Sequence, residues 1–231
     1  PIKANGKMAF NLSLNYQQFL AGTIIPALLH VLATVVGVGV AGRELRNKSL
    51  GKWFWGISGG NIARSSCFGV LFVALLGKLF FYSVVFCLWI TLTLLLVAWA
   101  EHPSLNNLGI TLVTACLFML ISLLLGVILA MLTMSKRKGL SNAGMITGPA
   151  YAFSGITYPL MAMPALAQKI AMLLPLTYYL QLQVAQLQMR QPWQSGLPTV
   201  YGFSLTVVVM IIVATLLTLP ALKRKHRWGM R

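Results

Sequence analysis

Five long apolar runs dominate this chain and restrict what it can fold into. They cover approximately residues 19–41, 79–99, 109–133, 143–160 and 201–222, and the fourth is short and rich in Gly and Pro. A helix needs about 20 predominantly apolar residues to cross a bilayer. No series of ten-residue segments with alternating polarity is present, which argues against a membrane barrel. We therefore predict an all-α polytopic membrane helical bundle with about five transmembrane helices.

The apolar run at residues 66–79 directly precedes the second of these spans. Joined to that span, it would give a helix of about 50 Å at 1.5 Å per residue, much longer than the hydrocarbon core. We therefore predict a separate helix that approaches the membrane at its cytoplasmic face, with Lys78 reaching the headgroups.

Charge is scarce and one-sided: 18 Lys and Arg stand against two acids, Glu44 and Glu101. This excludes hydrolysis by paired carboxylates and cation sites built from acids. A nucleic-acid partner is not expected, because the chain has little polar surface on which to cluster its charge. The phosphate-binding pattern G-x-x-x-x-G-K-[S/T] is absent, and the three Cys and three His are widely separated. We predict no catalytic residue, no cofactor and no metal in this chain.

The distribution of Lys and Arg predicts the orientation in the membrane, because cytoplasmic loops carry the excess of these residues. Fourteen fall on one side of the predicted spans, in residues 43–78, 136–138 and 223–231, and four fall on the other: Lys3, Lys7, Lys169 and Arg190. The first predicted span therefore begins outside the cell, and the carboxyl terminus is cytoplasmic.

An external amino terminus without a signal-peptide pattern suggests that a further span, with an external domain, precedes this segment. We accordingly expect residues 1–18 to be the end of an external segment. Residues 19–222 are the expected transmembrane domain. Residues 223–231 form a basic cytoplasmic tail that can meet anionic lipid.

The cytoplasmic segment at residues 42–60 contains an amphipathic pattern. Leu50, Trp53, Phe54 and Ile57 fall at i, i+3, i+4 and i+7 and so share one face of a helix. Such a helix lies in the membrane interface. Two readings fit this pattern: an anchor on the membrane surface, or a docking element for a cytoplasmic partner.

The external segment at residues 153–180 is interrupted repeatedly, by Ser154-Gly155, Pro159, Pro164 and Pro175. Lipid offers no substitute for a missing backbone donor, so broken helix is tolerated there only against protein or a wet cavity. Residues 165–174 are too short to cross and are expected to enter the outer leaflet and return. The segment is either a kinked loop or a re-entrant gate over a transport route.

Small residues recur every four positions in two spans, which lets helices pack closely. They are Ala33, Gly37 and Ala41 in the first span and Gly144, Gly148 and Ala152 in the fourth. Both spans are expected to face other helices, within the chain or across a dimer. His30, inside the first span, is expected to bond to a neighbouring helix rather than relay protons.

In order along the chain, several short motifs resemble the permease subunits of type-2 ABC exporters. They are Arg43-Glu44, Leu76-Gly77-Lys78-Leu79, Ser154-Gly155 with Pro159, Met163-Pro164, and Pro175-Leu176-Thr177-Tyr178. The likeness extends from residue 19 onward. These permeases have six spans, so the resemblance implies that this chain supplies the last five. The aromatic and glycine-rich stretch at residues 53–69 is longer than the family pattern.

The resemblance also implies partners and roles. An ABC ATP-binding subunit, which holds ATP and magnesium, would dock at a coupling helix within residues 42–57. A second permease, identical or related, would complete the transporter in a bacterial inner membrane. The residues expected to couple to the ATPase are Arg43, Glu44, Arg46, Leu50, Trp53 and Phe54, and those expected to shape an outer gate are Ser154, Gly155, Pro159, Pro164 and Pro175. The alternatives from other classes are a structural membrane subunit without transport, and a channel.

Overall fold

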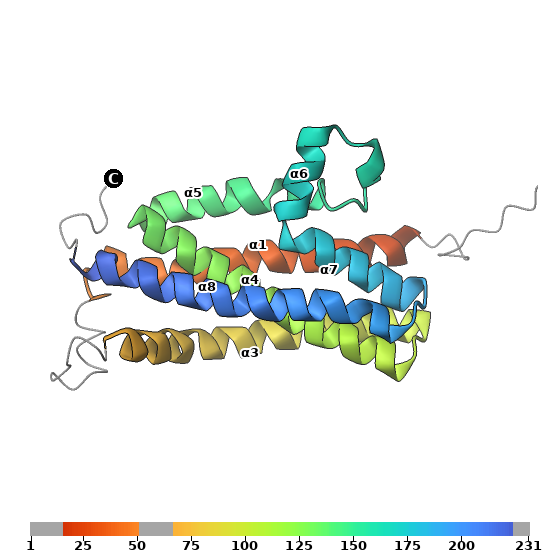
Figure 1. Ribbon diagram of the computed structural model, residues 1–231, viewed down its shortest axis with the longest axis horizontal. Coiled ribbons are helices and arrows are strands. Elements are labelled where there is room, and N and C mark those ends of the chain that lie inside the picture. Colours follow the sequence, from red (N-terminus) through yellow and green to blue (C-terminus); the bar gives the residue numbers. More distant parts are fainter. Residues whose placement is uncertain (1–15, 51–66, 224–231) are drawn as a thin grey trace, which may run out of the picture.

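The computed structural model describes residues 16–50 and 67–223, in which every regular element is helical. Four long helices run lengthwise through the bundle (Figure 1): α1 (Tyr16–Arg46), α3 (Cys67–Glu101), α4 (Leu105–Thr133) and α8 (Leu197–Lys223). Each of the four is long and apolar enough to cross a membrane, and the bent pair of α6 and α7 raises the number of candidate spans among the described residues to as many as five. The predicted all-α membrane bundle is confirmed.

Helix α4 is the centre of the bundle. It packs against α1, α3, α5 and α8, and more than half of its residues are buried. Its contact with α1 is unusually close at two glycines. A Cβ atom at Gly37 would lie 2.2 Å from the carbonyl oxygen of Leu123, and one at Gly126 would lie 2.1 Å from that of Thr34. The two backbones therefore touch, as small residues permit in membrane helices.

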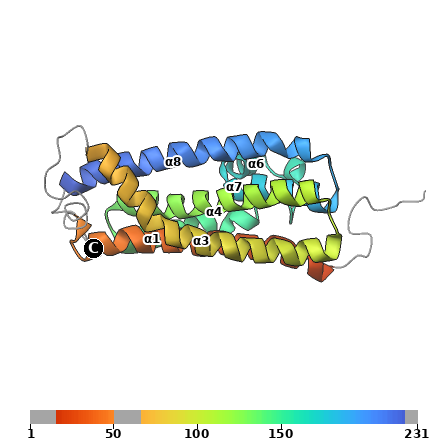
Figure 2. The ribbon, with the colours of Figure 1, turned by 90° about the horizontal axis from the view of Figure 1, so that it is seen from below.

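The prediction of a separate helix at residues 66–79 is wrong. Helix α3 runs without a break for 35 residues, from Cys67 to Glu101. It contains no proline, and Figure 2 shows that its first part runs obliquely from beside α8 toward α1 before the rest follows the long axis of the bundle. Lys78 pairs with Glu44 of α1, a partner that the prediction did not consider.

The predicted fourth span at residues 143–160 is also wrong. Helix α5 (Lys136–Thr147) ends before Pro149, which lacks a backbone donor, and a 3-10 turn, η1 (Pro149–Tyr151), follows. The chain then continues through bends and the short turn η2 (Leu160–Ala162).

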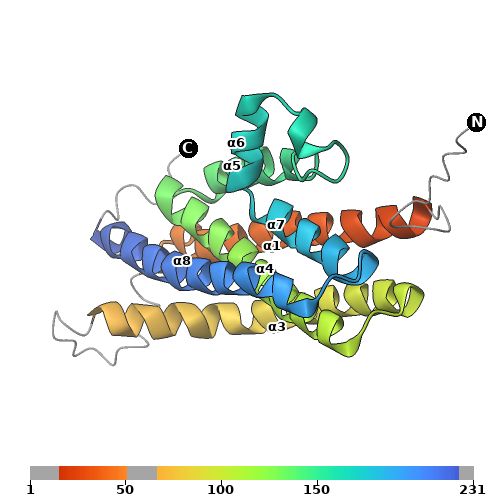
Figure 3. The same cartoon turned by 45° about the vertical axis from the view of Figure 1, so that its right-hand side comes forward.

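After these bends come α6 (Ala165–Leu173) and α7 (Pro175–Gln183), a π-helical turn, η3 (Val184–Gln188), and a 3-10 turn, η4 (Trp193–Gly196), that leads into α8. Figures 1 and 3 both show α5 and α6 on one side of the long helices. We refer to residues 148–174, between α5 and α7, as the broken segment.

Candidate functional site

Positive charge gathers at the end of the bundle where α1 stops and α5 starts. Arg43 and Arg46 lie exposed in the last turn of α1, where cations are favoured by the helix dipole. Lys136, at the start of α5, lies directly against Gly42, and Arg137 and Lys138 follow it. We call this cluster, completed by Lys48, the basic end.

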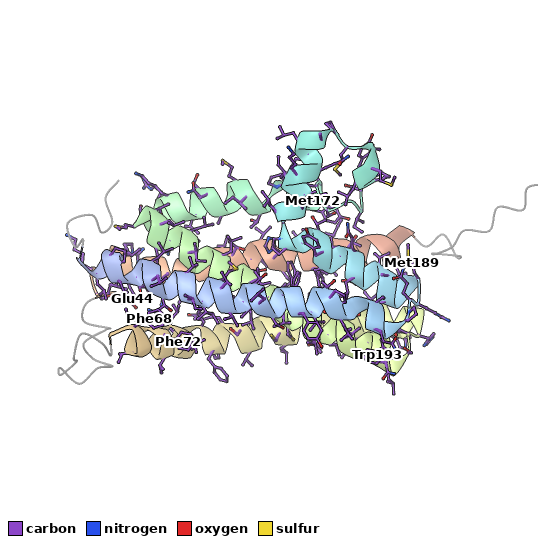
Figure 4. All side chains as sticks on the ribbon, in the orientation of Figure 1. Glu44, Phe68, Phe72, Met172, Met189 and Trp193 are labelled. Carbon is purple, nitrogen blue, oxygen red and sulfur yellow. The ribbon has the colours of Figure 1, made fainter. Side chains whose placement is uncertain are left out.

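An ion pair joins α1 to α3 at the basic end. Lys78 Nζ pairs with Glu44 Oε1, and Ser49 Oγ donates a hydrogen bond of 2.5 Å to Glu44 Oε2. The Ser49 amide also donates to the Glu44 carbonyl at 3.0 Å, so the turn after α1 is held to the same residue. Figure 4 shows Glu44 at the end of the bundle where α3 begins with Phe68 and Phe72, far from Met189 and Trp193. Sequence spacing gave no sign of this pairing, because 34 positions separate its partners.

The residues predicted to couple to an ATPase fall into three groups. Arg43 and Arg46 are exposed, and Glu44 is partly covered by its two partners. Leu50 is completely buried in the apolar core, so its side chain faces inward. Trp53 and Phe54 lie outside the described residues.

The predicted gate prolines each stand at the start of a short helical element. Pro159 precedes η2, Pro164 precedes α6, and Pro175 is the first residue of α7. A proline suits these positions because the first amides of a helix have no partner within it. Helices α6 and α7 bend by 83° at Leu174, and α7 packs against η1. The prolines therefore divide this part of the chain into short rigid pieces.

Ser154 and Gly155 form the turn that leads from η1 into the bends. Ser154 is fully buried, and its Oγ donates to the Tyr151 carbonyl at 2.6 Å. Gly155 has a φ of +82°, and a Cβ atom there would lie 2.8 Å from Leu160 Cγ. Both the left-handed backbone and the close side chain require glycine at this position.

Buried amides hold the far end of α7, and the sequence reading did not identify them. Asn107 Nδ2 of α4 donates to the carbonyls of Gln186 at 3.0 Å and Gln191 at 2.9 Å. Gln183 Nε2 donates to the carbonyl of Gly22 in α1 at 2.7 Å, and Gln186 Nε2 donates to Ser195 Oγ at 3.0 Å. The available signal was the repetition of Gln at residues 181, 183, 186 and 188 in an otherwise apolar chain.

Aromatic rings link α7 to the middle of the bundle. Phe118 of α4 stacks on His30 with ring centroids 5.2 Å apart and on Tyr179 with centroids 4.7 Å apart. His30 Nδ1 lies 2.7 Å from Ser122 Oγ of α4. The prediction that His30 bonds to a neighbouring helix is confirmed.

The two rows of small residues occupy different environments. Ala33 and Ala41 are buried, with Gly37 at the contact with α4. Gly144, Gly148 and Ala152 are exposed within the described part of the chain, and a Cβ atom at Gly144 would meet nothing there within 4 Å. The first row thus serves the fold of this chain, and the second faces outward.

A family model described as ABC-2 type transporter matches residues 60–187, which is more than half of the chain. The match includes Lys78, α4, α5 and the whole of the broken segment. Neither a curated protein nor a solved structure matches the chain.

Proposed function

Because the chain belongs to the ABC-2 type transporter family and is a multi-pass membrane component, we propose that it is the permease subunit of an ATP-driven exporter in a bacterial inner membrane. ATP and magnesium are held by a separate ABC ATP-binding subunit, which docks at the basic end. Export is the direction implied by the resemblance to type-2 ABC exporters.

The ion pair between Glu44 and Lys78 carries the proposal of a coupling site. It joins the end of α1 to the early part of α3, the two helices that the segment at residues 51–66 connects. A displacement of that segment by a partner therefore acts on both helices together. Since α1 touches α4 through Gly37 and Gly126, the displacement reaches the centre of the bundle.

The positive charge of the basic end supports both a cytoplasmic location for this end and a partner with an acidic surface. Exposed Arg43, Arg46, Arg137 and Lys138 support a cytoplasmic location for this end, because cytoplasmic segments carry the excess of Lys and Arg. The chain has 18 basic residues and two acidic ones, so most of the negative charge that neutralises its bases must come from a partner or from anionic lipid. An acidic groove on the ATPase is the partner surface that complements this end.

The outward face of α5 and the broken segment supports pairing with a second permease. Large apolar side chains are exposed here, with Met145 at 76%, Met161 at 95% and Leu173 at 83%. The irregular backbone stands to the side of the long helices (Figure 3). Irregular backbone at membrane depth requires protein or a wet cavity beside it, and the small residues Gly144 and Gly148 allow a partner helix to approach closely.

Site-specific cross-linking tests the docking proposal. In a variant with Cys67, Cys87 and Cys116 replaced by alanine, Asn47→Cys places a thiol on the exposed turn of the basic end. The matched control is Leu105→Cys, at the opposite end of the bundle and 86% exposed. In membranes that contain the co-expressed ATPase, a thiol-to-amine cross-linker should join the ATPase to the first variant only. Adducts at neither site, or equally at both, would contradict the proposal.

A further inference from the structure

Two of the three cysteines are distant in the sequence but meet where α3 packs against α4. Cys87 of α3 and Cys116 of α4 are both free thiols, and the Cys87 thiol donates a weak hydrogen bond to the Cys116 carbonyl at 4.0 Å. The two side chains also interact with each other, and Thr91, one turn further along α3, interacts with Cys116. The fold therefore brings two thiols together, away from the ends of both helices.

The space beside this pair is apolar and faces the membrane. Cys87 and Thr91 line a cavity of about 650 Å³ between α3, α4 and α8, and most of its other walls are leucine, valine and isoleucine. Phe80 and Leu88, which also line it, are 71% and 60% exposed. The volume falls within the range of about 300 to 1,000 Å³ found for small-molecule pockets. A small apolar molecule can therefore approach Cys87 from the lipid.

The pairing separates these two residues from ordinary buried cysteines. A single thiol in an apolar core acts as a small hydrophobic side chain and needs no chemical role. Two thiols in contact can also react with each other. No group of three or more His, Cys, Asp or Glu side chains in the described part of the chain could hold a metal ion, so a four-ligand metal site is not served here. Oxidation to a disulfide, by contrast, requires only the two thiols.

We propose that Cys87 and Cys116 are a redox pair that forms a disulfide between α3 and α4, and that the oxidant is a lipid-soluble quinone. Both S–H bonds break as the S–S bond forms, and two electrons and two protons pass to the quinone, which becomes a hydroquinone. Neither sulfur keeps a charge, which suits an apolar setting where an unpaired charge is costly. The proposal rests on the contact between the thiols and does not depend on the proposed export function.

The disulfide would join α3 covalently to the central helix of the bundle. It closes a loop between two residues that are 29 positions apart and that flank the turn from α3 into α4. Such a loop restricts the unfolded chain, so the oxidised form should resist a denaturing detergent better than the reduced form.

Counting free thiols in lipid nanodiscs tests the proposal. Cys67→Ala leaves only the two thiols of the pair in the full chain. Duroquinone is the apolar probe, and all its free ring positions carry methyl groups, so a thiol has no open position to which to add. Ferricyanide is the charged probe, which stays in water. After unfolding, the mass added by a maleimide reports the free thiols. Duroquinone should leave none and dithiothreitol should restore two, whereas ferricyanide should leave both free.

The matched control moves one thiol along α4. In Cys67→Ala with Cys116→Ala and Leu132→Cys, the second thiol lies at the end of the same helix, where Leu132 is 59% exposed. Both thiols should stay free with duroquinone in nanodiscs, but in sodium dodecyl sulfate the two chains should oxidise alike, because the unfolded chain no longer separates them. Unreacted thiols in the first chain, equal loss in the two folded chains, closure by ferricyanide as fast as by duroquinone, or linked dimers in place of monomers would each overturn the proposal.

Discussion

The packing of α1 against α4 is the opposite of the packing in the broken segment. At the first, two long helices touch backbone to backbone through Gly37 and Gly126. In the second, short elements are separated by prolines, and large apolar side chains such as Met161 remain exposed. Long helices in backbone contact move together as one body, whereas short pieces joined at bends can reorient separately.

This difference assigns separate tasks to the two regions. In the proposed function, α1 ends at the basic end, and its contact with α4 transmits the displacement caused by a docked partner. The broken segment, with α7, borders a cavity and faces outward, so it is the part suited to open and close.

Gly126→Ala should have the largest effect on folding. A methyl group there would lie 2.1 Å from the Thr34 carbonyl oxygen, and neither backbone can yield without separating α1 from α4. We expect a loss of about 3 kcal/mol in the free energy of unfolding, measured by titration with a denaturing detergent. Gly109→Ala is the control on the same helix, since a Cβ atom at Gly109 would meet nothing within 4 Å. Equal stability of the two variants would show that the close contact does not hold the helices together.

Asn107→Leu should have the next largest effect. It removes two hydrogen bonds, to the carbonyls of Gln186 and Gln191, and leaves both acceptors near an apolar side chain. A loss of about 2 kcal/mol is expected in the same titration. Asn106→Leu, on the exposed side of the same turn, should change little. Equal losses from both variants would mean that the Asn107 amide does not tie η3 and the residues after it to α4.

Gly155→Ala should destabilise the turn at the start of the broken segment by about 1 to 2 kcal/mol. Its positive φ and the nearby Leu160 both oppose a side chain. Because the strain is local, proteolysis after Tyr158 or Met161 should become faster before global stability falls. Gly202→Ala, in an open position on α8, is the control. Unchanged proteolysis would indicate that the turn does not control this segment.

Glu44→Gln should have the smallest effect on stability, about 1 kcal/mol, because the pair with Lys78 is not fully buried. Its effect on coupling should be larger, and it is measured as the ATP hydrolysis of the partner in the presence of this chain. Reversing both charges, with Glu44→Lys and Lys78→Glu, should recover part of the loss. A double variant no better than either single one would show that the pair itself is not required.

The parts of the fold that follow from apolar length were predictable, and those that depend on pairing were not. The apolar runs at residues 19–41, 109–133 and 201–222 lie within α1, α4 and α8, because each is long enough to form a helix that continues even where it contains Pro26 or Pro220. The span predicted at residues 143–160 is wrong because it was extended through Pro149, where α5 has ended and a 3-10 turn begins. The prediction divided α3 into two helices because it assumed that a span crosses the membrane at a right angle to the bilayer plane.

At the candidate site, too, local features were predictable from the sequence and contacts between distant residues were not. Pro164 and Pro175 correctly indicated where α6 and α7 begin, since the effect of a proline on a helix start is local. The ion pair of Glu44 with Lys78 and the hydrogen bond of His30 to Ser122 join residues 34 and 92 positions apart, which no local pattern encodes. Gly37 was singled out for its spacing in α1, but its neighbour Gly126 in α4 became visible only when the two helices met.

The division into a rigid pair and a movable segment is tested most directly by distances between spin labels in the complex with the ATPase. One pair joins Leu28 of α1 to Val113 of α4, and the other joins Val113 to Leu166 of α6; all three side chains are exposed. Between the nucleotide-free and ATP-trapped states, the first distance should stay constant and the second should change. A constant second distance, or an equal change in both, would contradict the account.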